Sequence, residues 1–205
     1  MLKIIGRGTS GNVMKVLWIA DELHVPYEQQ DLGGPFGGND APEFLARNPN
    51  GLVPVIEDDG VVLWESNAIV RYLAAKHGYG TMSPADPVRR AIADQWMDWQ
   101  QTVVAPAMSP IFWGLVRTPA AERDLPGIGR AIQRACTVWG VLDAHLSRHL
   151  YVAGDFSMGD VPLGPQVHRW LRLVTDRPPM PHLEAWYQRL TERPAYRKHC
   201  MGPLV

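Results

Sequence analysis

The sequence has only two cysteines, Cys136 and Cys200, and they stand far apart without a CxxC spacing. A disulfide framework, a cysteine-based zinc site and a dithiol redox motif are therefore unsupported. Two isolated thiols are typical of a reducing compartment, so we expect a cytoplasmic protein. The seven histidines show no metal-ligand spacing, and no metal site is expected.

Net charge and long apolar runs are scarce as well. The formal net charge of -1 at pH 7 gives no electrostatic reason to expect binding to nucleic acid or to an anionic membrane. No apolar run reaches the roughly 18 residues that a membrane span needs. The segment Met1–Gly6 is too short and too polar beyond its end for a secretory signal. A chain of 205 residues is nevertheless long enough to bury a sizeable core.

The first 78 residues alternate short β-like runs with helical patterns. Strands are predicted at 2–5, 27–32, 53–57 and 61–64, and helices at 12–23, 42–47 and 65–77. In the last of these helices, Ala68, Ile69, Tyr72 and Leu73 are expected to face inward. The Gly-rich stretch 33–38 must be irregular. This order predicts an α/β domain over residues 1–78, with a mixed four-stranded sheet covered by helices.

After a linker predicted at 79–87, the pattern is helical throughout, so 88–205 is predicted to be an all-helical C-terminal domain. Asp86-Pro87 favours a helix start, because aspartate is a good N-cap and proline suits the first turn. Pro106 and Pro110 predict a kink or break in that helix.

Three further helices are predicted beyond this point. Apolar residues in register from Ile128 to Leu150 indicate a long helix. Ser157–Asp160 has the pattern of a capping box and is expected to start another helix, with Asp160 as a structural cap. The last helix is predicted at 181–192.

Four segments carry a family pattern: Ser10–Val16, Asn48–Ile56, Trp64–Leu73 and Ser157–Asp160. Together and in this order they resemble the glutathione transferases, particularly the serine-type and bacterial branches. The resemblance implies a thioredoxin-like N-terminal domain that binds glutathione as co-substrate, and a cleft beside the helical domain for a small electrophile. It also implies a homodimer with its active sites beside the subunit interface.

Three residues before or at the start of the first helix are candidates for holding the thiolate of glutathione. A free thiol has a pKa of about 8.5, and a hydroxyl donor or a helix N-terminus stabilises its ionised form. Ser10 matches the catalytic serine of the family, although serine is also a common plain N-cap. Thr9 is a competing donor, since some bacterial relatives use a threonine there, and Asn12 could donate through its amide.

The resemblance assigns further residues to glutathione. Val53-Pro54 resembles the cis-proline pair whose backbone faces the cysteinyl part, the alternative being a trans proline that starts an edge strand. Glu65 and Ser66 would bind the γ-glutamyl ammonium and carboxylate at a helix N-terminus, the alternative being capping alone.

The glycyl end departs from the family pattern. Asn39 and Asp40 stand where some relatives have a histidine and a lysine, and Leu52 stands where relatives often have a glutamine. A cation and an amide are therefore missing, and Asp40 would repel the glycyl carboxylate unless it merely caps the following helix.

The pocket for the second substrate is predicted near Met108, Phe112, Trp113 and Arg117. Apolar residues at helical spacing also suit a plain core, and an arginine there also suits a solvated surface. The resemblance implies a glutathione transferase. Two alternatives on the same fold are a glutathione-dependent disulfide reductase or peroxidase, and a ligand-binding protein without catalysis.

Overall fold

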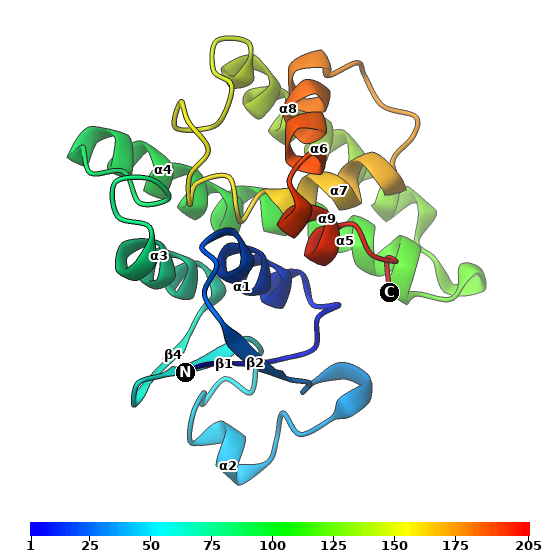
Figure 1. Ribbon diagram of the computed structural model, residues 1–205. Coiled ribbons are helices and arrows are strands. Elements are labelled where there is room, and N and C mark those ends of the chain that lie inside the picture. Colours follow the sequence, from blue (N-terminus) through cyan, green and yellow to red (C-terminus); the bar gives the residue numbers. More distant parts are fainter.

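A four-stranded sheet forms the N-terminal part of the computed structural model, which describes residues 1–205 (Figure 1). The strands are β1 (Leu2–Ile5), β2 (Tyr27–Gln30), β3 (Val55–Asp58) and β4 (Val61–Trp64), in the spatial order β2-β1-β3-β4. Strand β1 runs parallel to β2 and antiparallel to β3, and β3 and β4 form an antiparallel hairpin. The predicted mixed sheet of four strands is confirmed.

Helices α1 (Gly11–Glu22) and α3 (Ser66–His77) lie on one face of this sheet, and the short α2 (Pro42–Leu45) lies beyond the other (Figure 1). A 3-10 turn, η1 (Gly34–Phe36), occupies the predicted irregular stretch. The expectation for Ala68 is wrong, because its side chain is exposed. The inward face of α3 is instead centred on Ile69 and Leu73, which are fully buried.

After α3 the chain forms helices and no further strand, as predicted. These α-helices are α4 (Pro87–Trp99), α5 (Ala105–Phe112), α6 (Leu125–Leu146), α7 (Gly164–Leu173), α8 (Pro181–Thr191) and α9 (Pro194–Cys200). The side chain of Asp86 accepts a hydrogen bond from the backbone N–H of Arg89 at 2.8 Å, which confirms the predicted N-cap of α4. None of these helices combines the length and the hydropathy that crossing a bilayer requires.

The two prolines after α4 do not break the helix. The chain stays helical from Pro87 to Arg117, with the π-helical turns η2 (Gln100–Val104) and η3 (Trp113–Arg117) on either side of α5 and a 3-10 turn, η4 (Ala120–Glu122), after them. A proline lacks the N–H that an α-turn needs, and wider turns accommodate such a local mismatch. The helix therefore changes its winding where a break was predicted.

The predicted long helix is too long at its C-terminal end. It ends at Leu146, and Leu150 lies outside it with 65% of its surface exposed. The hydroxyl of Ser147 donates to the carbonyl oxygen of Ala144 at 2.7 Å. Such a bond offers the backbone an alternative to further helical turns.

Ser157 and Asp160 form only half of a capping box, and they do not start the helix. The hydroxyl of Ser157 accepts from the N–H of Gly159 at 3.3 Å, and the carboxylate of Asp160 accepts from the N–H of Ser157 at 3.0 Å. Turns follow, and α7 begins only at Gly164. The bonds of Ser157 and Asp160 therefore stabilise the turns that precede α7.

Asp160 is fully buried and joins separate parts of the helical region. Besides the N–H of Ser157, its carboxylate accepts the N–H of Val152 at 3.1 Å and the indole N–H of Trp186 in α8 at 2.9 Å. Burial raises the pKa of Asp160 to about 6, while these three donors act in the opposite direction. The predicted structural role of Asp160 is therefore wider than a helix cap, because its carboxylate joins three segments of the helical region.

One continuous hydrophobic core joins the sheet region to the helical region. Trp18 of α1 packs edge-on against Tyr196 of α9, with ring centroids 4.8 Å apart. A Cβ at Gly164, the first residue of α7, would lie 2.4 Å from the ring of Trp18. Since the core is shared, the boundaries proposed at residues 78 and 88 stay predictions.

Asp160→Ala should lower the free energy of unfolding by at least about 3 kcal/mol, because three buried N–H groups lose their acceptor at about 1–3 kcal/mol each. Asp155→Ala is the matched control, since Asp155 is an exposed carboxylate paired with Arg89 and should cost less than about 1 kcal/mol. Urea unfolding measures both. Equal losses for the two variants would contradict the bridging role of Asp160.

Candidate active site

A cleft of about 500 Å³ opens at the N-terminus of α1. Its walls come from the loop before α1, the Gly-rich loop, the residues before Pro54, and the segments α5, η3 and α7. The lining residues are Arg7, Thr9, Ser10, Gly11, Asn12, Gly34, Asn39, Leu52, Val53, Ala105, Met108, Ser109, Phe112, Trp113, Arg117, Gln166 and Arg169. The cleft thus brings together most residues that the sequence assigned to glutathione and to the second substrate.

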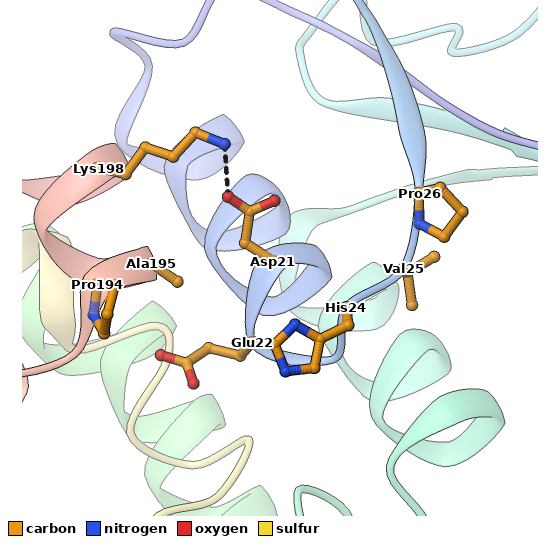
Figure 2. Close-up of a pocket in the computed structure, with 8 residues that line it drawn as sticks. All are labelled: Asp21, Glu22, His24, Val25, Pro26, Pro194, Ala195 and Lys198. Carbon is orange, nitrogen blue, oxygen red and sulfur yellow. Dashed lines mark hydrogen bonds and ion pairs between the residues drawn. The ribbon is translucent and has the colours of Figure 1, made fainter.

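A second hollow, of about 540 Å³, lies at the opposite end of α1 (Figure 2). Its acidic side chains are already paired, Asp21 with Lys198 and His199 at 2.7 Å each, and Glu22 with Arg193 at 2.7 Å. Figure 2 shows the ion pair between α1 and α9, and none of the residues drawn is a predicted site residue. This hollow is a joint between α1 and α9, so the first cleft is the candidate site.

Ser10 is the N-cap residue of α1, with φ -75° and ψ 124°. Its hydroxyl makes no hydrogen bond within the protein, so it does not act as a side-chain cap. The positive end of a helix favours an anion at this place. Thr9 and Asn12 line the same cleft, and their side chains also lack hydrogen-bond partners, so all three candidate donors face the cleft unpaired.

The Val53-Pro54 peptide bond is cis, in agreement with the expectation from the family pattern. Neither the N–H nor the C=O of Val53 pairs with another backbone group. The carbonyl oxygen of Leu52, in contrast, accepts from the Asn48 amide at 2.7 Å. Val53, which lines the cleft, therefore has one backbone donor and one backbone acceptor without a backbone partner.

At the predicted glycyl end, Asn39 lines the cleft and donates from its amide to the carbonyl oxygen of Gly51 at 2.7 Å. Asp40 is exposed and does not line the cleft. The alternative that Asp40 caps the next helix is wrong, because Ala41 is the N-cap of α2 and no side chain caps it.

Glu65 and Ser66 begin α3, outside the lining of the cleft. Glu65 has φ 71° and ψ 108°, a conformation that is costly for a residue with a Cβ and that is found at functional sites. The side chain of Glu65 is exposed, whereas Ser66 is buried and its hydroxyl accepts from Lys15 at 3.2 Å.

Lys15 lies at the centre of a buried polar network that the sequence interpretation missed. Its ammonium group also donates to Asn67 at 3.1 Å and to Gln100 at 3.0 Å, which ties α1 to α3 and η2. The Asn67 amide continues to the carbonyl oxygen of Met97 at 2.8 Å. Burial lowers the pKa of Lys15 to about 7, and the charge of Glu65 opposes this shift. The available signal was a lysine inside an otherwise apolar helical stretch.

The four residues predicted for the second substrate all line the cleft. Met108 and Phe112 are buried in its wall, whereas Trp113 and Arg117 are exposed at it. The guanidinium groups of Arg117 and of Arg169, which the sequence interpretation missed, lie 5.6 and 4.1 Å from the centre of the Phe112 ring. No group of three or more His, Cys, Asp or Glu side chains is arranged to hold a metal ion.

Comparison with known proteins finds the family that the sequence motifs resemble. Residues 4–75 match the family model "Glutathione S-transferase, N-terminal domain". The glutathione S-transferase GstB of Escherichia coli (strain K12) is 44% identical over the full length of both chains. The probable glutathione S-transferase GSTF2 of Oryza sativa subsp. japonica is 30% identical over 96% of this chain and 94% of its own.

Among solved structures, the theta class glutathione S-transferase of Xanthomonas axonopodis pv. citri with glutathione bound superposes with a TM-score of 0.96. It is 46% identical in sequence, and the match covers 100% of this chain and 99% of that chain. Glutathione transferase F7 from Populus trichocarpa superposes with a TM-score of 0.87 at 27% identity, over 99% of this chain and all of that one.

Lys15 should make the stability of the protein rise with pH. Its pKa is about 7 in the folded protein and about 10.4 in an unfolded chain, so the unfolded chain binds more protons between these values. The free energy of unfolding should therefore increase across this window, by up to about 1.4 kcal/mol per pH unit. Lys15→Met lacks the titrating group and should lack this increase.

Urea unfolding at several pH values between 7 and 10 measures the difference in stability between the wild type and Lys15→Met. The difference should grow in favour of the wild type as the pH rises. A difference in stability that stays constant between pH 7 and 10 would show that burial does not lower the pKa of Lys15.

Proposed function

This chain belongs to the glutathione S-transferase family, and on that premise we propose that its cleft binds glutathione along the N-termini of α1 and α3 and that Ser10 activates the thiol. The protein is an enzyme that uses glutathione as co-substrate and conjugates it to electrophiles. In this reaction the thiol releases its proton, the sulfur forms a bond to the electrophilic carbon, and the leaving group departs with its electron pair.

The place of Ser10 as the N-cap residue of α1, with an unpaired hydroxyl, supports its assignment as the activating residue over Thr9 and Asn12. In the proposed complex it donates its hydrogen bond to the thiolate sulfur, at the positive end of α1. Lowering the thiol pKa by about two units corresponds to about 2.7 kcal/mol of thiolate stabilisation. A single well-placed donor together with a helix N-terminus can supply a stabilisation of this size.

The rest of glutathione is assigned to groups with unused bonding capacity. The free backbone N–H and C=O of Val53 would pair with the cysteinyl part as a neighbouring strand does. The exposed carboxylate of Glu65 would accept from the γ-glutamyl ammonium, and the N-terminus of α3 at Ser66 would hold the γ-glutamyl carboxylate. Asn39 and Leu52 border the place left for the glycyl end.

The second substrate is a small electrophile with an apolar body. Met108, Phe112 and Trp113 give the helical wall of the cleft an apolar surface opposite the residues assigned to glutathione. A volume of about 500 Å³ lies in the range of small-molecule sites, which supports a compact substrate.

We also propose a homodimer. Strand β4 is an edge of the sheet, and its Val61, Val62 and Trp64 are 43%, 44% and 39% exposed. An apolar edge strand calls for a covering partner. Most homo-oligomers are built on two-fold symmetry, and β4 leads directly into Glu65, so an interface there would lie beside the glutathione site.

Ser10→Ala should lower kcat/KM for conjugation by roughly 10²-fold, the loss expected for one preorganised hydrogen-bond donor. The pKa of the bound glutathione thiol, followed by thiolate absorbance, should rise. Thr9→Val and Asn12→Ala are the matched controls and should change both quantities far less. An unchanged thiol pKa in Ser10→Ala, with a raised pKa in either control, would transfer the role to that residue.

The protein should sediment at close to twice its chain mass of 22.9 kDa. Val62→Lys introduces a charge on the exposed edge strand and should shift the equilibrium toward the monomer at micromolar concentration. A wild-type protein that sediments as a monomer at this concentration would contradict the proposed dimer. A dimer that Val62→Lys leaves intact would place the interface elsewhere.

A further inference from the structure

Three arginines line the cleft without any acidic partner. The side chains of Arg7, Arg117 and Arg169 take part in no ion pair and donate no hydrogen bond within the protein. No aspartate or glutamate lines the cleft. Several other half-buried arginines are neutralised, in contrast, as Arg71 is by Asp94 and Arg193 by Glu22. The cleft therefore concentrates positive charge.

Arg117 and Arg169 both lie close to one aromatic ring on the helical wall, that of Phe112. Their guanidinium carbons lie 5.6 and 4.1 Å from the centre of the Phe112 ring, and they come from the separate segments η3 and α7. Arg169 also packs against the first residue of α1, since a Cβ on Gly11 would lie 2.8 Å from one of its terminal nitrogens. Arg169 thus reaches from the second-substrate wall to the residue beside Ser10.

Arg7 lies at the Gly-rich loop of the cleft. A Cβ on Gly34 would lie 2.8 Å from its Nε, and a Cβ on Gly33 would lie 3.2 Å from one of its terminal nitrogens and 3.0 Å from the amide oxygen of Asn39. Arg7 is therefore next to the residue proposed for the glycyl end of glutathione. Its charge still acts on the pair around Phe112, because the charge of Arg117 lowers the pKa of Arg7.

Keeping these like charges together costs free energy unless an anion joins them. Burial, and then the nearby charge of Arg117, lowers the pKa of Arg169 to about 10. The pKa of Arg7 is lowered by the same two causes. The N-terminus of α1 adds positive potential at the same place, and a cleft with low-dielectric walls focuses it.

We propose that Arg117 and Arg169 form a carboxylate-binding subsite for the second substrate, an organic acid whose apolar body packs on Phe112 and Trp113. This inference rests on the proposed function, because it deepens the choice of electrophile for that same cleft. Guanidinium groups bind carboxylates through paired, charge-assisted hydrogen bonds, which suits this pair. The chemistry of the transfer is unchanged, since the carboxylate takes no part in the bonds that form and break.

A pair of unreactive ligands tests the subsite by calorimetry, without depending on turnover. 3,5-Dinitrobenzoate and 3,5-dinitrobenzamide have nearly the same shape and differ in charge. The wild type, saturated with glutathione, should bind the benzoate at least about 10-fold more tightly, as expected for one charge-assisted contact of about 1.4 kcal/mol. High salt should weaken the binding of the benzoate and leave that of the benzamide unchanged.

The variant Arg117→Gln should remove most of the preference for the benzoate. Arg117 is exposed, so this change should leave the fold intact. Arg134→Gln is the control for net charge, because Arg134 is an exposed arginine of α6 outside the cleft, and it should keep the preference. Arg169→Gln should act in the same direction as Arg117→Gln, with its fold checked by thermal unfolding.

Steady-state kinetics with 4-chloro-3,5-dinitrobenzoate and its amide connects the subsite to the reaction. In both substrates the glutathione sulfur bonds to the carbon that carries chlorine, and chloride leaves with the bonding pair. Arg117→Gln should raise the KM of the benzoate about 10-fold while the KM values of the amide and of glutathione stay within about twofold. Arg7→Gln should instead raise the KM of glutathione, since Arg7 lies beside Asn39.

Equal binding of the two dinitro ligands to the wild type would overturn the proposal. A rise in the KM of glutathione in Arg117→Gln, with the benzoate preference intact, would also overturn it and would assign the arginine to the glycyl carboxylate of glutathione. Failure of the proposed function is a separate result, since it would appear as an absence of glutathione-dependent turnover of the amide.

Discussion

Helix α1 has no solvent-facing side between residues 13 and 20, because it packs against α3 and against the helices α7 and α9. Every polar group that the helix carries over this stretch must therefore find its partner inside the protein. The same burial fixes where the two ends of the helix lie. One end carries Ser10 into the cleft, and the other carries Asp21 and Glu22 into contact with α9.

The burial of Lys15 follows directly from this constraint. An ammonium group without water needs several acceptors, and it finds them on Ser66, Asn67 and Gln100. Because Ser66 is the first residue of α3, the network links the start of that helix to α1. The two helix N-termini to which we assign the thiolate and the γ-glutamyl carboxylate of glutathione are thus held at a fixed spacing, which favours preorganised binding.

Much of this arrangement can be predicted from local sequence. The existence of the four strands, the hairpin around Gly60, the N-cap at Asp86 and the loop position of Ser10 all depend on near neighbours in the chain, which is why they were predicted correctly. The bounds of two strands differ, since β2 ends at Gln30 and β3 begins at Val55. The cis bond at Pro54 is different, because base rates favour the trans form and only the family pattern indicated cis. The end of α6 was misplaced because apolar periodicity continues past Leu146, where the hydroxyl of Ser147 bonds to the backbone instead. The start of α7 was misplaced because the capping-box pattern at Ser157–Asp160 is followed by turns and not by a helix.

What the sequence hid are the interactions between distant residues. The partners of Lys15 lie 51, 52 and 85 positions away, and no periodicity within α1 indicates them. The same holds for Arg7, Arg117 and Arg169, which look like ordinary surface arginines until the fold brings them to one cleft. The net charge does not indicate a positively charged cleft either, because a chain with a formal charge of -1 can still place its positive and negative residues in separate regions.

That separation of charge follows the two ends of α1. Acidic residues in the last turn of a helix are unfavourable for its dipole, yet Asp21 and Glu22 stand there. Their ion pairs with Lys198 and Arg193 of the C-terminal segment offset this cost and anchor α9. At the other end, the helix N-terminus, Arg7 and Arg169 add positive potential in the same direction, and no aspartate or glutamate lines the cleft. The C-terminal end of α1 is therefore neutralised by its ion pairs with the C-terminal segment. The N-terminal end faces the cleft with its positive charge unpaired, which favours the binding of anionic groups.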